Sequence, residues 1–123
     1  MLLVDDDALV RETLDAGMRR MGYEVVSTNS GANALRFFET PEGEFDVVIT
    51  DQMMPGMTGI ELGQRLAPLR PKLPLILMTG YAAALNEPKV KAMGFFAMLM
   101  KPVTMQELDA TLQDALKTVS GKV

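Results

Sequence analysis

The chain has 123 residues, of which 48% are hydrophobic and 23% charged, and its formal net charge is −4. This length suits one domain with a single hydrophobic core, and no apolar run approaches the roughly 20 residues of a membrane-spanning helix. Because Cys and His are absent, disulfides, thiolate metal sites and a phosphohistidine within the chain are excluded. The negative charge and the lack of a basic stripe argue against nucleic-acid binding. The N-terminus leads into three aspartates rather than a secretory signal, so we expect a cytoplasmic domain without membrane contact.

Short apolar runs along the chain predict five β-strands. They cover residues 1–5, 24–28, 47–50, 75–78 and 97–100. The runs are continuous rather than alternating, which is typical of strands that are buried on both faces. We therefore expect a parallel sheet with helices on each side, in an α/β fold.

Helical patterns separate these runs. They predict helices over residues 8–21, 30–39, 58–69, 87–93 and 104–119, followed by a frayed tail at 120–123. In the first helix, apolar residues recur at helical spacing at Val10, Leu14, Met18 and Met21. In the third helix, the corresponding stripe consists of Leu62, Leu66 and Leu69.

Several residues mark the ends of these helices. Asp7 is interpreted as the N-cap of the first helix, and Thr58 with Glu61 as a capping box at the start of the third. Gly22 and Gly94 are placed to end the first and fourth helices.

Polar residues follow four of the five strands. Asp5 and Asp6 come after the first strand, Asp51 after the third, Thr79 after the fourth and Lys101 after the fifth. In a parallel α/β sheet, ligands bind outside the carboxyl ends of the strands. Several carboxylates at one site repel each other unless a cation is present, and Mg²⁺ prefers oxygen ligands. These residues therefore predict a phosphoryl and metal site.

Four stretches of the sequence resemble the receiver domain of two-component response regulators. They are LLVDDD, VVITDQMMPGMTG, LILMTGY and LMKPV, in the order and at the spacing of that family. The resemblance covers essentially the whole chain. It implies a receiver domain at residues 1–119 with a doubly wound, flavodoxin-like (βα)5 fold, whose five parallel strands have the order 2-1-3-4-5.

The resemblance also implies a function. Asp51 would accept a phosphoryl group from a phosphohistidine of a sensor histidine kinase or of a histidine phosphotransfer domain, with Lys101 and Thr79 contacting that group. Phosphorylation would change the surface formed by the fourth helix, fifth strand and fifth helix. The domain would catalyse only its own phosphorylation and dephosphorylation, as a monomer or a weak phosphorylation-dependent dimer.

The metal ligands follow from the same resemblance. Asp6, Asp51 and the backbone carbonyl of Met53 would hold Mg²⁺, or Mn²⁺ in its place, and Asp5 would act through a metal-bound water.

Other expectations concern access to the site and its switching. Gly80 leaves room for the phosphoryl group, and Tyr81 would lie over the entrance. Met98 stands where receivers often carry a switching aromatic residue. The Lys101–Pro102 peptide is expected to be cis. Leu9 lies off the apolar stripe of its helix, and we expect it to be exposed beside the site, where it would help to dock the kinase.

The identity of the parent protein is a separate question. The stretches SGANAL, TDQMMPGMTGIEL, MTGY and LMKPV are most similar to receivers of hybrid sensor histidine kinases, and a free-standing response regulator is the other reading. Two alternative functions stay open. Asp5 and Asp7 superficially resemble the start of haloacid dehalogenase-like phosphatases, and a phosphorylation-silent interaction module would share the fold.

Overall fold

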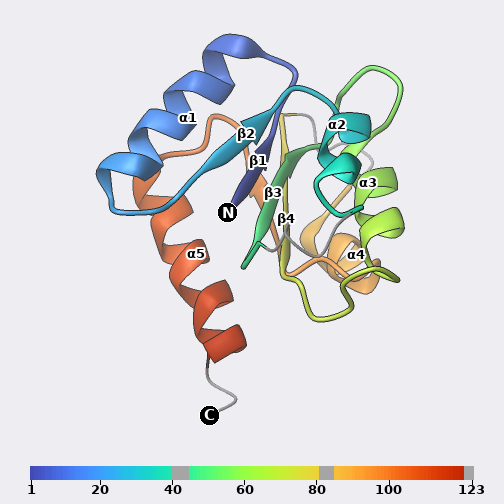
Figure 1. Ribbon diagram of the computed structural model, residues 1–123. Coiled ribbons are helices and arrows are strands. Elements are labelled where there is room, and N and C mark those ends of the chain that lie inside the picture. Colours follow the sequence, from blue (N-terminus) through green and yellow to red (C-terminus); the bar gives the residue numbers. More distant parts are fainter. Residues whose placement is uncertain (40–44, 81–84, 121–123) are drawn as a thin grey trace.

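Strands and helices alternate along the chain in a computed structural model that describes residues 1–39, 45–80 and 85–120 (Figure 1). The strands are β1 (Leu2–Val4), β2 (Val26–Thr28), β3 (Val48–Asp51), β4 (Leu75–Thr79) and β5 (Ala97–Met100). The helices are α1 (Ala8–Arg20), α2 (Gly31–Arg36), α3 (Gly59–Leu66), α4 (Glu87–Ala92) and α5 (Met105–Ser120). The strands form one parallel sheet in the order β2-β1-β3-β4-β5, which confirms the predicted fold.

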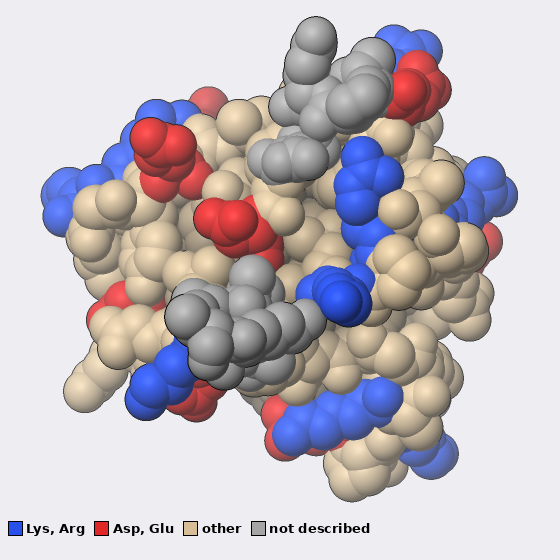
Figure 2. Space-filling model, turned by 60° about the horizontal axis from the view of Figure 1, so that its bottom comes forward, with Lys and Arg blue, Asp and Glu red and all other residues tan. Residues whose placement is uncertain are grey.

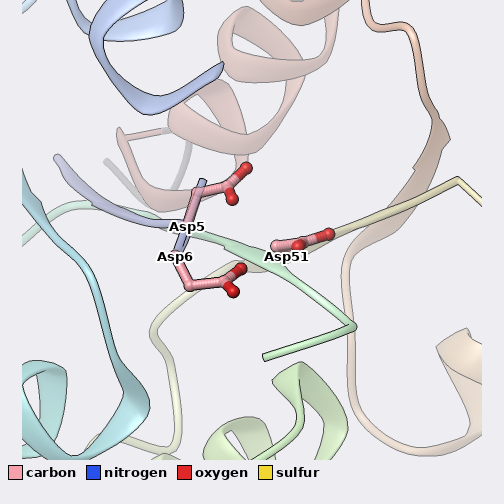
Figure 3. Close-up of side chains that lie close together, drawn as sticks. All are labelled: Asp5, Asp6 and Asp51. Carbon is pink, nitrogen blue, oxygen red and sulfur yellow. The ribbon is translucent and has the colours of Figure 1, made fainter. Parts of the chain in front are cut away.

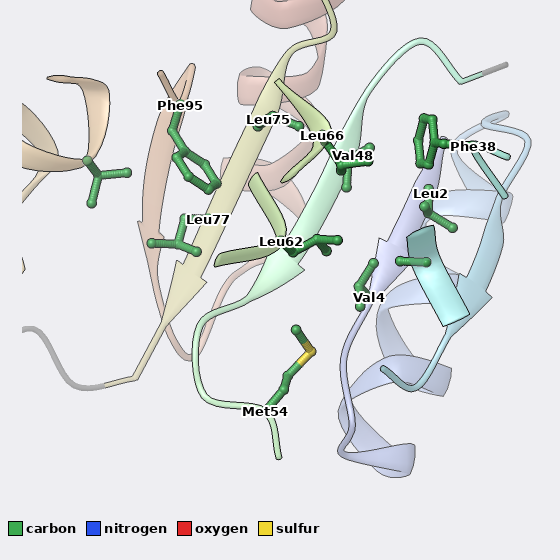
Figure 4. Close-up of a cluster of buried hydrophobic side chains, with 12 residues drawn as sticks. Leu2, Val4, Phe38, Val48, Met54, Leu62, Leu66, Leu75, Leu77 and Phe95 are labelled. Atoms are coloured by element: carbon green, nitrogen blue, oxygen red, sulfur yellow. The ribbon is translucent and has the colours of Figure 1, made fainter. Parts of the chain in front are cut away.

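The sheet carries a separate hydrophobic core on each face, because successive side chains of a strand point to opposite sides. On one face, Leu2 and Val48 pack with residues of α2, α3 and α4, and Figure 4 shows this core. On the other face, Leu3 and Ile49 pack with residues of α1 and α5. The helices therefore cover both faces of the sheet, as continuous apolar strands require.

Two of the predicted helical stripes are wrong at their last residue. Leu69 is 49% exposed, because α3 ends at Leu66 and the following turn no longer faces the sheet. Met21 is 38% exposed, because it is the C-cap of α1. Leu14 and Met18 are buried as predicted, so the stripe of α1 is correct up to its last turn.

The residues predicted to cap or end helices are confirmed, although α2 and α3 end three residues before their predicted limits of 39 and 69. The Asp7 carboxylate accepts a hydrogen bond from the Val10 N–H and caps α1. Thr58 and Glu61 form the expected reciprocal capping box at the start of α3. Gly22 and Gly94 follow the C-caps of α1 and α4 with φ angles of 97° and 100°, a conformation that favours glycine.

The end of the molecule at the bottom of Figure 1 carries charges of both signs. Figure 2 brings the lower end of Figure 1 toward the viewer, and in this view Lys and Arg side chains are scattered among neutral and acidic residues. Of the helices in the three described ranges, none is both long and apolar enough to cross a membrane.

The parallel register brings the carboxyl ends of the strands to one edge. Val4 is paired with Thr50, Asp51 with Met78, and Thr79 with Met100. The residues that follow these positions therefore lie together at the upper edge of Figure 1.

The start of α3 approaches this edge closely. A Cβ atom added to Gly59 would lie 2.4 Å from the Asp51 carbonyl oxygen and 2.7 Å from a methyl carbon of Leu77. The Gly59 N–H also donates to the Gln52 carbonyl at 3.0 Å. Only glycine therefore fits this contact without moving the end of β3.

We predict that Gly59→Ala lowers the free energy of unfolding by about 1–3 kcal/mol, the usual cost of forcing an extra carbon into a filled site. Urea denaturation measures the change. Gly80→Ala is the matched control, because its added Cβ would come no closer than 3.7 Å, to the Lys101 Cβ. Equal stability of the two variants would contradict the assigned packing.

Candidate phosphoryl and metal site

Three carboxylates converge at the carboxyl edge of the sheet. Asp5 and Asp6 follow β1, Asp51 ends β3, and one oxygen from each lies within 4.8 Å of the others. Figure 3 shows that the side chains of the three acids lie close together. Asp5 and Asp51 are buried, whereas Asp6 is exposed. The structure thus brings together the acidic residues that the sequence analysis selected.

Lys101 supplies the positive charge at this site. Its Nζ lies 3.0 Å from Asp5 Oδ2 and 3.1 Å from Asp51 Oδ1. The backbone N–H of Lys101 donates to the Thr79 carbonyl at 2.9 Å, which fixes the residue beside the end of β4. One ammonium group therefore joins the ends of β1 and β3 to the segment after β5.

Asp5 is held at both carboxylate oxygens. Oδ1 accepts the Asp7 N–H at 2.9 Å, and Oδ2 accepts from Lys101. Burying a charged group is costly unless it is paired and hydrogen-bonded, and both conditions are met here. Asp5 is consequently a fixed anchor for Lys101.

The donor set fits a divalent cation with oxygen ligands. Asp6 is open to solvent, and Lys101 contacts only Oδ1 of Asp51 among the recorded ion pairs of the described residues. Asp6 and Asp51 can therefore offer carboxylate oxygens to a cation, whereas both oxygens of the neighbouring Asp5 are already hydrogen-bonded. Such a site suits Mg²⁺, which binds through one or two carboxylates and keeps several waters.

Burial and neighbouring charges shift the pKa values of Asp51 and Lys101. Burial raises the pKa of the Asp51 carboxyl, and the charges of Asp5 and Asp6 raise it further. The hydrogen bond from Lys101 lowers this pKa, but the result lies above the ordinary value. Burial lowers the pKa of the Lys101 ammonium, but its hydrogen bonds to Asp5 and Asp51 outweigh this and raise the pKa overall. Lys101 therefore remains charged at neutral pH.

The other predicted site residues lie around this centre. Thr79 is buried at the end of β4, and Gly80 lies beside the Lys101 Cβ. The Met53 side chain is 68% exposed, and Met98 is half-buried in β5 against the core that Figure 4 shows. The Lys101–Pro102 peptide bond is cis. Tyr81 falls outside the described residues.

Two residues that the sequence analysis did not select hold the backbone of the site. Arg11 Nη1 donates to the Asp5 carbonyl at 2.8 Å, and Gln52 Oε1 accepts the Ile60 N–H at 2.9 Å at the start of α3. The available signal for Arg11 was its position four residues, or about one helical turn, after the Asp7 N-cap, which places it near the end of β1. Gln52 directly follows Asp51, which was the corresponding signal for this residue.

An apolar pocket of about 490 Å³ adjoins the site. Leu9 and Val10 of α1 line one side, and Lys101, Pro102 and Val103 line the other. Leu9 is 74% exposed at its rim, as expected from its position off the helical stripe.

We predict that Asp51→Asn raises the free energy of unfolding at pH 7. The raised pKa means that the folded state binds this proton more tightly than the unfolded chain, so ionising Asp51 at higher pH costs stability. The gain should be full above the raised pKa and disappear as the pH falls toward the ordinary value of 3.8.

Urea denaturation across this pH range measures the effect. Glu12→Gln, which removes an exposed carboxylate of α1, is the control and should show no such gain. Lower stability of Asp51→Asn at pH 7 would contradict the assigned cost of burial.

The model of the response regulator receiver domain family matches residues 1–113. The DNA-binding transcriptional regulator NtrC of Azospirillum brasilense is 31% identical over 118 residues, which cover 96% of this chain and 24% of the relative. The transcriptional regulatory protein ZraR of Escherichia coli K12 is 35% identical over 116 residues, covering 94% of this chain and 26% of the relative. The chain thus spans about a quarter of the length of these curated relatives.

Solved structures agree with this match. A response regulator receiver domain protein of Clostridium thermocellum has a TM-score of 0.91 at 28% identity, covering 99% of this chain and 97% of the other. The response regulator TrrA of Thermotoga maritima, solved in complex with Mg²⁺ and BeF, has a TM-score of 0.82 at 28% identity, covering 94% and 96%. The chain belongs to the response regulator receiver domain family and is a module of two-component phosphorelay signalling.

Proposed function

We propose that Asp51 accepts a phosphoryl group from a phosphohistidine of a partner protein in a Mg²⁺-dependent reaction. The observation that carries this proposal is the position of Asp51: a buried carboxylate whose Oδ1 is paired with Lys101 and which lies within 4.8 Å of the oxygens of Asp5 and Asp6. This arrangement fixes the orientation of one carboxylate and places opposite charge beside it.

The transfer proceeds through the Asp51 oxygen that Lys101 does not contact. This oxygen forms a bond to phosphorus while the phosphorus–nitrogen bond of the phosphohistidine breaks, and the electron pair of that bond returns to the imidazole ring. The product is an acyl phosphate on Asp51. The chain contributes mainly by positioning the carboxylate and by neutralising charge, which is how phosphoryl transfer is generally catalysed.

Named residues hold the reacting groups. Asp6, Asp51 and the Met53 carbonyl would hold Mg²⁺ or Mn²⁺, and Asp5 would act through a metal-bound water. A cation held by these residues would offset the repulsion between the carboxylate and the incoming phosphoryl group. Lys101, anchored on Asp5, and the Thr79 hydroxyl contact the phosphoryl oxygens.

The same contacts link phosphorylation to a surface. Movement of Thr79 and Lys101 toward the phosphoryl group would shift the ends of β4 and β5, which are joined by the hydrogen bond between the Lys101 N–H and the Thr79 carbonyl. We propose that this changes the surface of α4, β5 and α5, with Met98 taking the place of a switching aromatic residue, and that any dimer forms weakly and upon phosphorylation.

The partner is a sensor histidine kinase or a histidine phosphotransfer domain. The apolar pocket between α1 and the segment after β5 adjoins Lys101, and exposed Leu9 lies at its rim. We propose that a helix carrying the phosphohistidine docks here, because an apolar side chain beside the site gives it a contact close to the reacting atoms. The reaction takes place in the cytoplasm.

The curated relatives described above are transcriptional regulators rather than hybrid kinases. They favour a response regulator with an output domain as the parent protein, over the hybrid sensor kinase that the sequence motifs suggested. The receiver family match also favours phosphoryl acceptance over an aspartate-nucleophile phosphatase.

Incubation with acetyl phosphate and Mg²⁺, followed by intact-mass and peptide mass spectrometry, tests the proposed reaction. We expect one alkali-labile phosphoryl group on Asp51 in the natural chain and none in Asp51→Asn. Asp6→Asn should require more Mg²⁺ for the same rate. An unmodified natural chain would indicate a phosphorylation-silent module, and turnover through Asp5 would favour the phosphatase.

We predict that Leu9→Ser slows phosphoryl transfer from the cognate kinase and leaves the rate with acetyl phosphate unchanged, because only the protein donor needs the docking contact. Leu69→Ser is the matched control, since Leu69 is also exposed but lies after α3, away from the lining of this pocket. Equal kinase-dependent rates for the natural chain and Leu9→Ser would remove the docking role.

A further inference from the structure

The direction of the Asp6 side chain depends on its backbone. Asp5 is held through its own carboxylate by Asp7 and Lys101, but Asp6 is exposed, and no hydrogen bond to its carboxylate is recorded among the described residues. Its carboxylate nevertheless lies with those of Asp5 and Asp51 (Figure 3). The peptide unit between Asp5 and Asp6 must therefore be held in place for Asp6 to face the site.

Arg11 holds this peptide unit. Its Nη1 donates to the Asp5 carbonyl oxygen at 2.8 Å, and this oxygen belongs to the peptide bond that joins Asp5 to Asp6. Arg11 itself is fixed in the first turn of α1, where its N–H donates to the Asp7 carbonyl at 2.9 Å. The Asp7 carboxylate caps the same turn, so the support for the peptide is a rigid element.

We propose that Arg11 is a positioning residue of the metal site, which acts by fixing the Asp5–Asp6 peptide and so directing the Asp6 carboxylate toward the cation. The inference rests on the Mg²⁺ site of the proposed function. Groups that orient metal ligands through hydrogen bonds influence affinity without touching the metal. Arg11 would have this role toward Asp6, through the backbone rather than through the carboxylate.

The direction in which the Mg²⁺ affinity changes on replacing Arg11 distinguishes this role from a purely electrostatic one. A guanidinium near a cation site repels the cation, so loss of the Arg11 charge alone would strengthen Mg²⁺ binding. Loss of the hydrogen bond frees the peptide and weakens binding. The two explanations therefore predict opposite changes for the same substitution.

Isothermal titration with Mg²⁺ tests the proposal on the natural chain, Arg11→Gln, Arg11→Lys and Arg20→Gln. We expect about tenfold weaker binding for Arg11→Gln, at the lower end of the loss seen when partners of metal ligands are removed. Arg11→Lys keeps the charge and a donor, and should lie between Arg11→Gln and the natural chain. Arg20→Gln removes an exposed charge from the last turn of α1 and should bind Mg²⁺ as tightly as the natural chain or more tightly.

The acetyl phosphate reaction provides a second measurement. At saturating Mg²⁺, Arg11→Gln should recover the rate of the natural chain, because only the affinity for the cation has changed. A general disturbance of the fold would lower the saturated rate as well, and circular dichroism during heating monitors the fold directly.

Equal or tighter Mg²⁺ binding by Arg11→Gln would overturn the proposal. If Arg11→Gln does not fold, Arg11→Lys decides the question, with weaker binding supporting the role and unchanged binding refuting it. Failure of the natural chain to bind Mg²⁺ would instead refute the metal site itself, and the inference with it. Failure of the Arg11 prediction alone would leave the proposed function intact.

Discussion

The site depends on one ammonium group shared between two buried carboxylates. Lys101 Nζ lies 3.0 Å from Asp5 and 3.1 Å from Asp51, and both acids are almost fully withdrawn from solvent. Without the Lys101 ammonium, burial and the repulsion between Asp5 and Asp51 would favour protonation of one of the two carboxyl groups. Because Lys101 follows β5, Asp5 follows β1 and Asp51 ends β3, the same contact also fixes the relative positions of the three strand ends. Electrostatics and topology are therefore coupled at this edge of the sheet.

The ammonium balances only part of the local charge. Three carboxylates and one ammonium leave an excess of two negative charges when all are ionised, which a divalent cation would neutralise. Burial is the largest cause of the raised pKa of Asp51, and the charges of Asp5 and Asp6 add to the rise against the contribution of Lys101. The chain accepts a cost in stability at this position, as is common where a buried charge serves a reaction. Asp5, with both oxygens hydrogen-bonded, holds Lys101 beside Asp51.

Much of this arrangement could be predicted from the sequence, and the parts that could not share a physical reason. Continuous apolar runs predicted the strands, and the residues after them predicted the carboxylates and Lys101, because every parallel strand ends at the same edge. Asp7 and Thr58 were predicted as caps from local patterns alone. Arg11 and Gln52 were missed because each bonds a backbone group of another segment: Arg11 donates to the Asp5 carbonyl, and Gln52 accepts the Ile60 N–H. Every residue carries such backbone groups, so only the positions of Arg11 after Asp7 and of Gln52 after Asp51 pointed to these contacts. Leu69 was misplaced because periodicity continued through residues where the helix had already ended.

A crystal structure with Mg²⁺ and beryllofluoride, which stands in for a phosphoryl group, tests the central claim most directly. The account predicts beryllium on the Asp51 oxygen that Lys101 does not contact, and Mg²⁺ against Asp6, Asp51 and the Met53 carbonyl. Lys101 should contact a fluoride while its Nζ stays within hydrogen-bond distance of Asp5. Beryllofluoride on another residue, or Mg²⁺ bound directly to Asp5 with Lys101 displaced, would contradict it.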